Sequence, residues 1–352
     1  MNNNNVTHIA QRLITFASVS TDHEAIGNAL DFVTGILRPG IRTKILDHNG
    51  TKLLWATTTD FKSPDVLLLC HIDVVKAQAG DFAPRVSKKR IMGRGAFDMK
   101  GSLATMIAVI NTINTTKKIQ LLITSDEELG GHNGAKWFFE NHKIVPTIAV
   151  VPDGTSIQEI ITKQKGPMHL VIEVEGKPSH GSRPWEGDNP ITKLIRIIKE
   201  INQVKIATSN KDWLPTFTPT NFEAISSINQ IPKLARLTLD LRVTSNKQLM
   251  RVKNILQKHN AKIINTFGDG IIFDQKVNKS VESWASIVER ITHKPVIQTS
   301  LTGASDARHL PKSTQVIVTR GVGGNAHGDN EWVDIRSLNQ LAAITKLFIK
   351  NI

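Results

Sequence analysis

Histidines and carboxylates follow several apolar runs of the sequence, at the points where β-strands are expected to end. VLLLC leads into His71, IQLLIT leads into Glu127 and Glu128, TIAVV is followed by Asp153, and QVIVTRG leads through a glycine-rich turn to His327. Loops at the carboxyl ends of strands in open α/β sheets converge on one crevice, so we expect these side chains on one side of a sheet. Mixed imidazole and carboxylate ligands suit zinc, with cobalt or manganese as substitutes.

The spacing within two of these segments suits metal chemistry. In His71-Ile72-Asp73 the two-residue spacing places both polar side chains on one face, so Asp73 can accept a hydrogen bond from the imidazole and fix its tautomer. In the pair Glu127 and Glu128, one carboxylate can bind metal while its neighbour takes a proton from metal-bound water. The ordinary alternatives are a solvated His and Asp beyond a strand, and an acidic pair at a helix start.

Three further polar residues have ordinary explanations when each is taken singly. Asp98, in GRGAFDMKG, precedes a helical pattern and fits a helix N-cap, although the surrounding glycines also indicate a constrained turn. Asp153 fits a turn residue, and His327 fits a solvated loop histidine. The combination of all these residues, rather than any single one, favours a functional site.

The elements that must position these residues follow an α/β pattern. Apolar runs rich in β-branched residues predict strands at 53–57, 66–70, 119–124 and 148–151, and helical periodicity appears at 5–16, 24–37, 99–113 and 134–141. We therefore predict an α/β fold with a mostly parallel sheet and helices on both faces.

The pattern changes near residue 163 and changes back near residue 278. Between these points it predicts a strand at 169–174, a helix at 190–201, strands at 218–228 and 235–243, another helix and a last strand, in the order β-α-β-β-α-β. Beyond them it predicts a helix, strands at 295–299 and 315–319, and a closing helix at 335–350. We predict a discontinuous domain, 1–164 and 277–352, interrupted by a smaller α+β domain, 165–276.

Composition and charge narrow the functional classes. The 352 residues, 40% hydrophobic and 21% charged, are typical of a globular protein, and the single cysteine, Cys70, cannot form an internal disulfide. The start, MNNNNVTH, does not resemble a secretory signal, and no apolar run reaches the ~20 residues of a membrane helix, so we expect a cytoplasmic protein without a membrane partner. The net charge of +13 is spread over both parts and lacks a nucleic-acid-binding signature, so we expect no nucleic-acid partner.

The order of the motifs resembles the metallopeptidase M20 family. HID, GRGAFDMKG, EELGG, VVPDG and GNAHGDNE follow one another as in that family, which includes acetylornithine deacetylase, succinyl-diaminopimelate desuccinylase, aminoacylase and carboxypeptidase G2. The resemblance covers nearly the whole chain, because GKPSHGSRPWEGDNPI and NQIPKLARLTLDLR match the family's inserted domain.

The resemblance implies a centre of two divalent metal ions, zinc by default. By motif position, Asp98 bridges both ions, His71 and Asp153 complete one site, and Glu128 and His327 complete the other. Several family members have Glu at the position of Asp153, which leaves its role as a ligand unchanged.

The resemblance also implies roles for residues that do not bind metal. Glu127 becomes the general base and Asp73 the group that orients the first metal histidine. In the inserted lid domain, His180 reaches the scissile carbonyl, while Asn229 and Arg242 grip a substrate carboxylate. In dimeric members the histidine serves the neighbouring subunit, so we expect a homodimer formed through the inserted domain.

Together these observations predict a metal-dependent hydrolase that cleaves an amide bond of an N-acyl amino acid or small peptide. Arg183 and Arg308 are further candidates for binding a substrate carboxylate. The chain departs from the desuccinylase pattern, because Gly323 and Gly324 stand where that enzyme has an asparagine and Asn325 is shifted. The alternatives are a dinuclear aminopeptidase, a binding protein without catalysis and a basic nucleic-acid binder.

Overall fold

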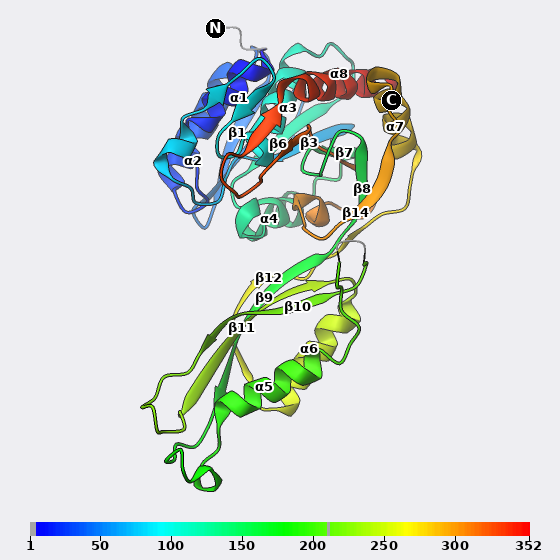
Figure 1. Cartoon of the computed structure of the whole chain (residues 1–352). Helices are drawn as coiled ribbons and strands as arrows, with labels where there is room; N and C mark the ends of the chain where they lie inside the picture. The colour runs from blue at the N-terminus through cyan, green and yellow to red at the C-terminus, as the bar shows by residue number, and fades with distance from the viewer. Residues whose placement is uncertain (1–4, 210–211) are drawn as a thin grey trace. The chain divides into compact units, whose positions relative to one another are not determined.

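The computed structural model describes residues 5–209 and 212–352 and contains two compact units. Unit 1 consists of the described residues within Met1–Lys163, Asp274–Leu301 and Ser305–Ile352, and unit 2 consists of those within Gln164–Phe273 and Thr302–Ala304 (Figure 1). Parts of the two predicted domains, residues 1–4 and 210–211, lie outside the described residues.

Unit 1 is built on a nine-stranded sheet with the order β1-β2-β6-β3-β7-β15-β8-β13, in which β14 also pairs with β8. The four adjacent strands β6, β3, β7 and β15 run parallel, so their carboxyl ends lie at the same edge of the sheet. The strands are β1 (Arg42–His48), β2 (Thr51–Thr57), β3 (Val66–His71), β6 (Ile119–Thr124), β7 (Ile148–Val151), β8 (Glu159–Gln164), β13 (Phe273–Asp274), β14 (Ile297–Leu301) and β15 (Gln315–Val318).

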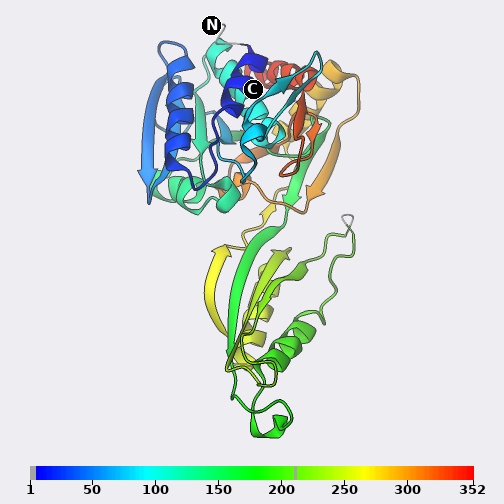
Figure 2. The same cartoon turned by 60° about the vertical axis from the view of Figure 1, so that its left-hand side comes forward.

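Helices cover both faces of this sheet, which explains why its central strands β3, β6 and β7 are buried along their whole length. One face shares a continuous hydrophobic core with α1 (Val6–Ile14), α2 (His23–Ile36), α3 (Gly101–Thr112), α7 (Lys279–Thr292) and α8 (Ile335–Asn351). α2 lies against β2 near the β1 edge (Figure 2). On the other face, Phe138 of α4 (Trp137–His142) packs edge-on against Trp55 of β2. The predicted α/β class, with a mostly parallel sheet and helices on both faces, is confirmed.

Several element boundaries differ from the predictions for local reasons. The helix predicted from residue 99 begins at Gly101, because Asp98 and Met99 have non-helical φ/ψ of −115°/93° and −130°/26°. The strand predicted at 218–228 runs over Thr216–Glu223 and gives way to exposed residues such as Ile225. Strands β1 and β8 were not predicted, since polar residues interrupt both.

A small second sheet in unit 1 supports two loops that matter for the site. It has the order β16-β17-β5-β4, formed by Gly323–Gly324, Trp332–Asp334, Arg90–Met92 and Arg85–Val86. Strand β5 leads into the turn that carries Asp98, and the β16–β17 loop carries His327. Pairing of β17 with β5 therefore brings together two segments that are far apart in the sequence.

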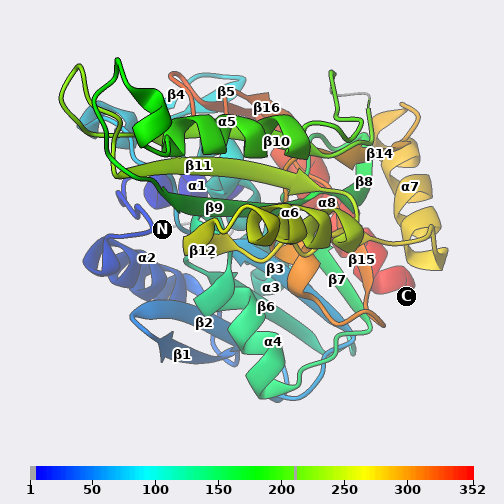
Figure 3. The same cartoon turned by 90° about the horizontal axis from the view of Figure 1, so that it is seen from below.

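Unit 2 has the element order β-α-β-β-α-β, with strands β9 (Gly166–Glu175), β10 (Thr216–Glu223), β11 (Leu234–Val243) and β12 (Lys262–Gly268). Its antiparallel sheet has the order β10-β11-β9-β12. The helices α5 (Pro190–Ile201) and α6 (Asn246–Lys258) lie side by side on one face of it (Figure 3). In the parts of the chain that the structure describes, no helix is long and apolar enough to cross a membrane.

Candidate metal centre

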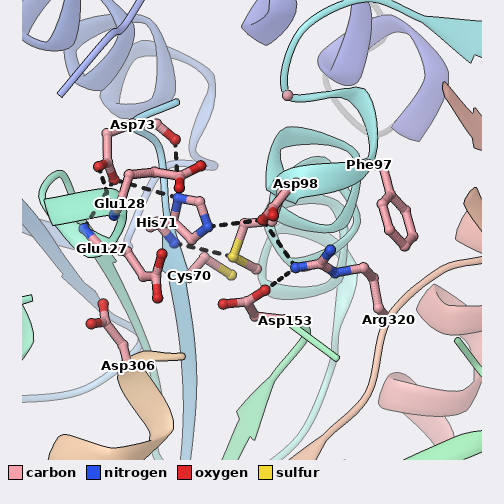
Figure 4. Close-up of polar contacts among 12 residues, drawn as sticks. Cys70, His71, Asp73, Phe97, Asp98, Glu127, Glu128, Asp153, Asp306 and Arg320 are labelled. Carbon is pink, nitrogen blue, oxygen red and sulfur yellow. Dashed lines mark hydrogen bonds and ion pairs between the residues drawn. The ribbon is translucent and has the colours of Figure 1, made fainter. Parts of the chain in front are cut away.

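Six titratable side chains meet at the edge of the unit 1 sheet where the parallel strands end. Figure 4 labels all of them except His327. They come from the last residue of β3, the turns after β6 and β7, the turn before α3, and the β16–β17 loop. They form two groups, each with ligand atoms within 4.8 Å of one another: His71, Glu127 and Asp153, and Asp98, Glu128 and His327.

Asp98 belongs to the second group, but its carboxylate also faces His71 of the first group. Its Oδ1 is 3.3 Å from His71 Nε2, and its Oδ2 is 3.4 Å from His327 Nε2. The turn that presents Asp98 is held by the buried carboxylate of Glu331, which accepts hydrogen bonds from the backbone N–H groups of Phe97 and Asp98 at 2.8 Å each. A carboxylate fixed in this way offers one oxygen to each group, as a bridging metal ligand requires.

The second group has an acceptor that suits a cation. His327 Nε2 is 3.1 Å from Glu128 Oε2, whereas the other carboxylate oxygen, Glu128 Oε1, is buried and has no hydrogen-bond partner among the described residues. Burying an unpaired carboxylate oxygen is costly, and a divalent cation with oxygen and nitrogen ligands would satisfy it. The donor set therefore fits the divalent metal that the motifs imply.

Asp73 connects the first histidine to the acidic turn. The Nδ1 of His71 lies 3.0 Å from the backbone oxygen and 3.4 Å from Oδ1 of Asp73, which leaves Nε2 facing the site. The Asp73 carboxylate also accepts hydrogen bonds from the backbone N–H groups of Glu127, at 3.3 Å, and Glu128, at 3.2 Å, and from Ser20 Oγ, at 2.7 Å. One buried carboxylate thus orients an imidazole and the two glutamates.

The electrostatics of the centre reflect its burial and its closely spaced carboxylates. Burial raises the pKa of Glu127 well above its usual value, and the charge of Glu128 raises it further. Burial likewise raises the pKa of Glu128. Hydrogen bonds to Asp98 and Glu128 raise the pKa of His327 to about 10. A divalent ion bound here would relieve the same cost of burying closely spaced carboxylates.

Three residues near the centre were not assigned there from the sequence. Arg320 donates hydrogen bonds to Asp98 Oδ1, at 2.9 Å, and to Asp153 Oδ1. Asp306 accepts a hydrogen bond from Thr124, and burial raises its pKa. Arg308, predicted as a candidate for substrate binding, lies buried with Nη1 at 3.9 Å from Glu127 Oε1. The sequence offered one signal for placing Arg320 at the site, which is its position directly after the apolar run QVIVT.

The residues assigned to substrate binding lie in unit 2. His180 and Asn229 come together on exposed loops, where Asn229 Nδ2 is 3.4 Å from His180 Nε2. His180 Nδ1 also lies 2.8 Å from Ser182 Oγ. Arg242 lies on β11, and its Nε and Nη2 donate to Asp240 at 2.8 and 3.1 Å. A substrate carboxylate would therefore have to share this guanidinium with Asp240.

Comparison with solved structures supports the fold. The chain is similar to an M20 family metallo-carboxypeptidase from Sulfolobus solfataricus, with a TM-score of 0.80, 19% identity and coverage of 98% of both chains. It is also similar to a tripeptidase from Staphylococcus aureus, with a TM-score of 0.80, 20% identity and coverage of 100% of this chain and 98% of the other. At these identities the likeness establishes the fold alone.

Comparison with sequences establishes the family. Succinyl-diaminopimelate desuccinylase from Pelagibacter ubique is 30% identical to the chain, with 97% of each protein covered. The enzyme of that name from Ehrlichia ruminantium is 28% identical over 97% of this chain and 96% of its own length. The model of the peptidase family M20/M25/M40 matches residues 67–351. The chain therefore belongs to this peptidase family and is a metal-dependent hydrolase that acts on amide bonds.

Proposed function

We propose that the protein uses two divalent ions to hydrolyse the amide bond of an N-acyl amino acid or a small peptide that carries a free carboxylate. The observation that carries this proposal is the position of Asp98, whose two oxygens face two separate groups of ligand atoms. The mixture of nitrogen and oxygen ligands favours zinc, with cobalt or manganese as substitutes.

In this proposal the ligands divide between the two ions. His71 and Asp153 would hold one ion, Glu128 and His327 would hold the other, and Asp98 would contribute an oxygen to each. When bound, the ions supply the Lewis acidity that activates a water and polarises the amide carbonyl.

The proton transfers are assigned to Glu127. Its carboxylate accepts the proton of the attacking water and passes it to the leaving amine. Burial raises the pKa of Glu127, which makes its carboxylate a stronger base. The grouping of Glu127 with His71 and Asp153 would also suit a metal ligand, and the metal content of a Glu127 variant separates the two roles.

The inserted domain, residues 165–276, is proposed to act as a lid and to form a homodimer. His180 would donate a hydrogen bond to the developing oxyanion, and Asn229 and Arg242 would bind the substrate carboxylate. The exposure of His180 and Asn229 supports this, because both side chains are accessible to a ligand. A cytoplasmic location remains a prediction from the sequence.

A substrate panel tests the proposal. N-succinyl and N-acetyl amino acids, dipeptides, and the same compounds with the carboxylate converted to an amide are incubated with the zinc-loaded protein. We expect the protein to hydrolyse the compounds that carry a free carboxylate. This activity should be lost after dialysis against a chelator and restored by zinc. Cleavage that requires a free N-terminal amine would instead identify an aminopeptidase.

Arg242→Ala tests the recognition of the carboxylate. The variant should lose activity only on the substrates that bear a carboxylate, and equal losses on their amides would reject this role. Arg236→Ala is the matched control, because Arg236 lies on the same strand and pairs with Glu173 at 2.9 Å.

A further inference from the structure

Arg320 is a buried cation placed among proposed metal ligands. It follows β15, so it reaches the same sheet edge as His71 and Asp153. Its Nη2 donates to Asp98 Oδ1 at 2.9 Å and also to Asp153 Oδ1, and its guanidinium carbon lies 4.5 Å from the centre of the Phe97 ring (Figure 4). Two carboxylates and an aromatic ring therefore fix the guanidinium at the centre.

The contacts of Arg320 fall on one of the two proposed ion positions. Asp98 Oδ1, to which Arg320 donates, is the oxygen that faces His71. The opposite oxygen, Asp98 Oδ2, faces His327. Within the described residues, the ion pairs of Glu128 and Asp98 Oδ2 are with His327, and none is with a guanidinium.

An ion held by His71, Asp98 and Asp153 would need oxygens that already bind a positive charge. It would have to displace charge-assisted hydrogen bonds and lie close to a guanidinium in a buried site, where like charges repel strongly. Arginine keeps its charge at any physiological pH, so deprotonation cannot relieve this repulsion. An ion held by Asp98 Oδ2, Glu128 and His327 competes only with a proton on His327, and the imidazole can release that proton when it binds metal.

We propose that Arg320 makes the two ion positions unequal, so that the position of Glu128 and His327 fills first and the position of His71 and Asp153 fills second, with lower affinity. This inference rests on the proposed two-ion function. It assigns to Arg320 the role of an internal cation that occupies the second position until a metal ion displaces it. The alternative effect, in which Arg320 orients Asp98 and Asp153 and thereby strengthens metal binding, has the opposite sign.

Calorimetric titration of the metal-free protein with zinc tests the inference without measuring activity. The wild-type protein should bind one ion tightly and a second one more weakly. Arg320→Met should leave the first step unchanged and strengthen the second by about tenfold or more, because a fixed positive charge beside that position is removed. Arg90→Met is the matched control. The guanidinium carbon of Arg90 also stacks on an aromatic ring, 3.7 Å from the centre of the Trp332 ring, but this side chain is exposed.

Two ligand variants assign the steps in the wild-type background, so the test stands even if Arg320→Met does not fold. His327→Ala should abolish the tight step, and Asp153→Asn should abolish the weak step. Three outcomes would overturn the inference while leaving the two-ion function in place. They are loss of the tight step in Asp153→Asn, two equal steps in the wild-type protein, and weaker binding of the second ion in Arg320→Met. Failure of the wild-type protein to bind any divalent ion would instead refute the proposed function.

Discussion

The strand-end cluster of unit 1 and the His180 loop of unit 2 are built in opposite ways. In the cluster, Asp73 is buried and accepts hydrogen bonds from a serine and two backbone N–H groups, and Glu331 fixes the Asp98 turn in a similar manner. His180 and Asn229 lie on exposed loops and are linked to each other by one hydrogen bond of 3.4 Å.

This difference separates two tasks. Residues on rigid strand ends with many fixed contacts can hold ions at a constant geometry, whereas residues on exposed loops can adjust to a substrate. We therefore expect substitutions in the cluster to change metal binding or the chemical step. Substitutions in the loop should change catalysis while leaving the metal in place.

The largest effect is expected for Glu127→Gln. Removing the general base should lower kcat by about 10²- to 10⁴-fold, the usual contribution of general acid–base catalysis, while both ions remain bound. Kinetics and metal analysis of the same preparation measure the two quantities. Glu140→Gln, at an exposed acid of α4, is the control. Loss of an ion from Glu127→Gln would show that Glu127 is a ligand, not a base.

His180→Ala should follow, with a fall in kcat of about 10²- to 10³-fold, as for the loss of one oxyanion donor. The metal content should not change, because His180 lies outside the cluster. Unchanged kcat would remove His180 from the mechanism.

A mixture of the two inactive variants asks which subunit uses His180. If the proposed homodimer forms, co-expressed Glu127→Ala and His180→Ala chains would give a mixed dimer in which one site retains Glu127 and receives the partner's intact loop. Recovered activity therefore indicates that the histidine acts across the dimer. A mixture as inactive as its parents indicates that each subunit uses its own.

Asp73→Asn should weaken zinc binding by about 10- to 100-fold, because the imidazole of His71 loses the carboxylate that orients it. Isothermal titration measures this change, with Asp31→Asn, an exposed residue of α2, as the control. If Asp73→Asn binds zinc as tightly as the wild type, the backbone oxygen of Asp73, 3.0 Å from His71 Nδ1, is sufficient to orient the imidazole.

Taken per pH unit, the smallest expected effect is the dependence of zinc affinity on pH. Hydrogen bonds to Asp98 and Glu128 raise the pKa of His327 to about 10, so this imidazole is protonated at pH 7 in the absence of an ion. Binding through its nitrogen must release that proton, so affinity should rise with pH, by about tenfold per unit for one proton. Titrations at pH 6, 7 and 8 check this, and an affinity independent of pH would contradict it.

The strand-end residues were accessible from the sequence because each follows a continuous apolar run. His71, Glu128 and Asp153 could be placed at one sheet edge from this pattern alone, and the structure brings them there. Whether they bind metal stays a prediction.

Other features could not be derived from local patterns. Asp98 and His327 lie on irregular turns that are held together by tertiary contacts such as that of Glu331, which is 233 residues from Asp98. Arg320 was not assigned to the site, since its contact with Asp98 spans 222 residues. The edge strand β1 was missed because it is rich in polar residues and its exposed positions do not follow the regular alternation of a half-buried strand.

The most direct test of the central claim is diffraction at the zinc absorption edge from crystals grown with zinc. The account predicts two anomalous peaks roughly 3.5–4 Å apart, with the Asp98 carboxylate between them. His71 and Asp153 should lie beside one peak, with Glu128 and His327 beside the other. An absence of peaks at this sheet edge, or zinc bound only elsewhere, would contradict the account.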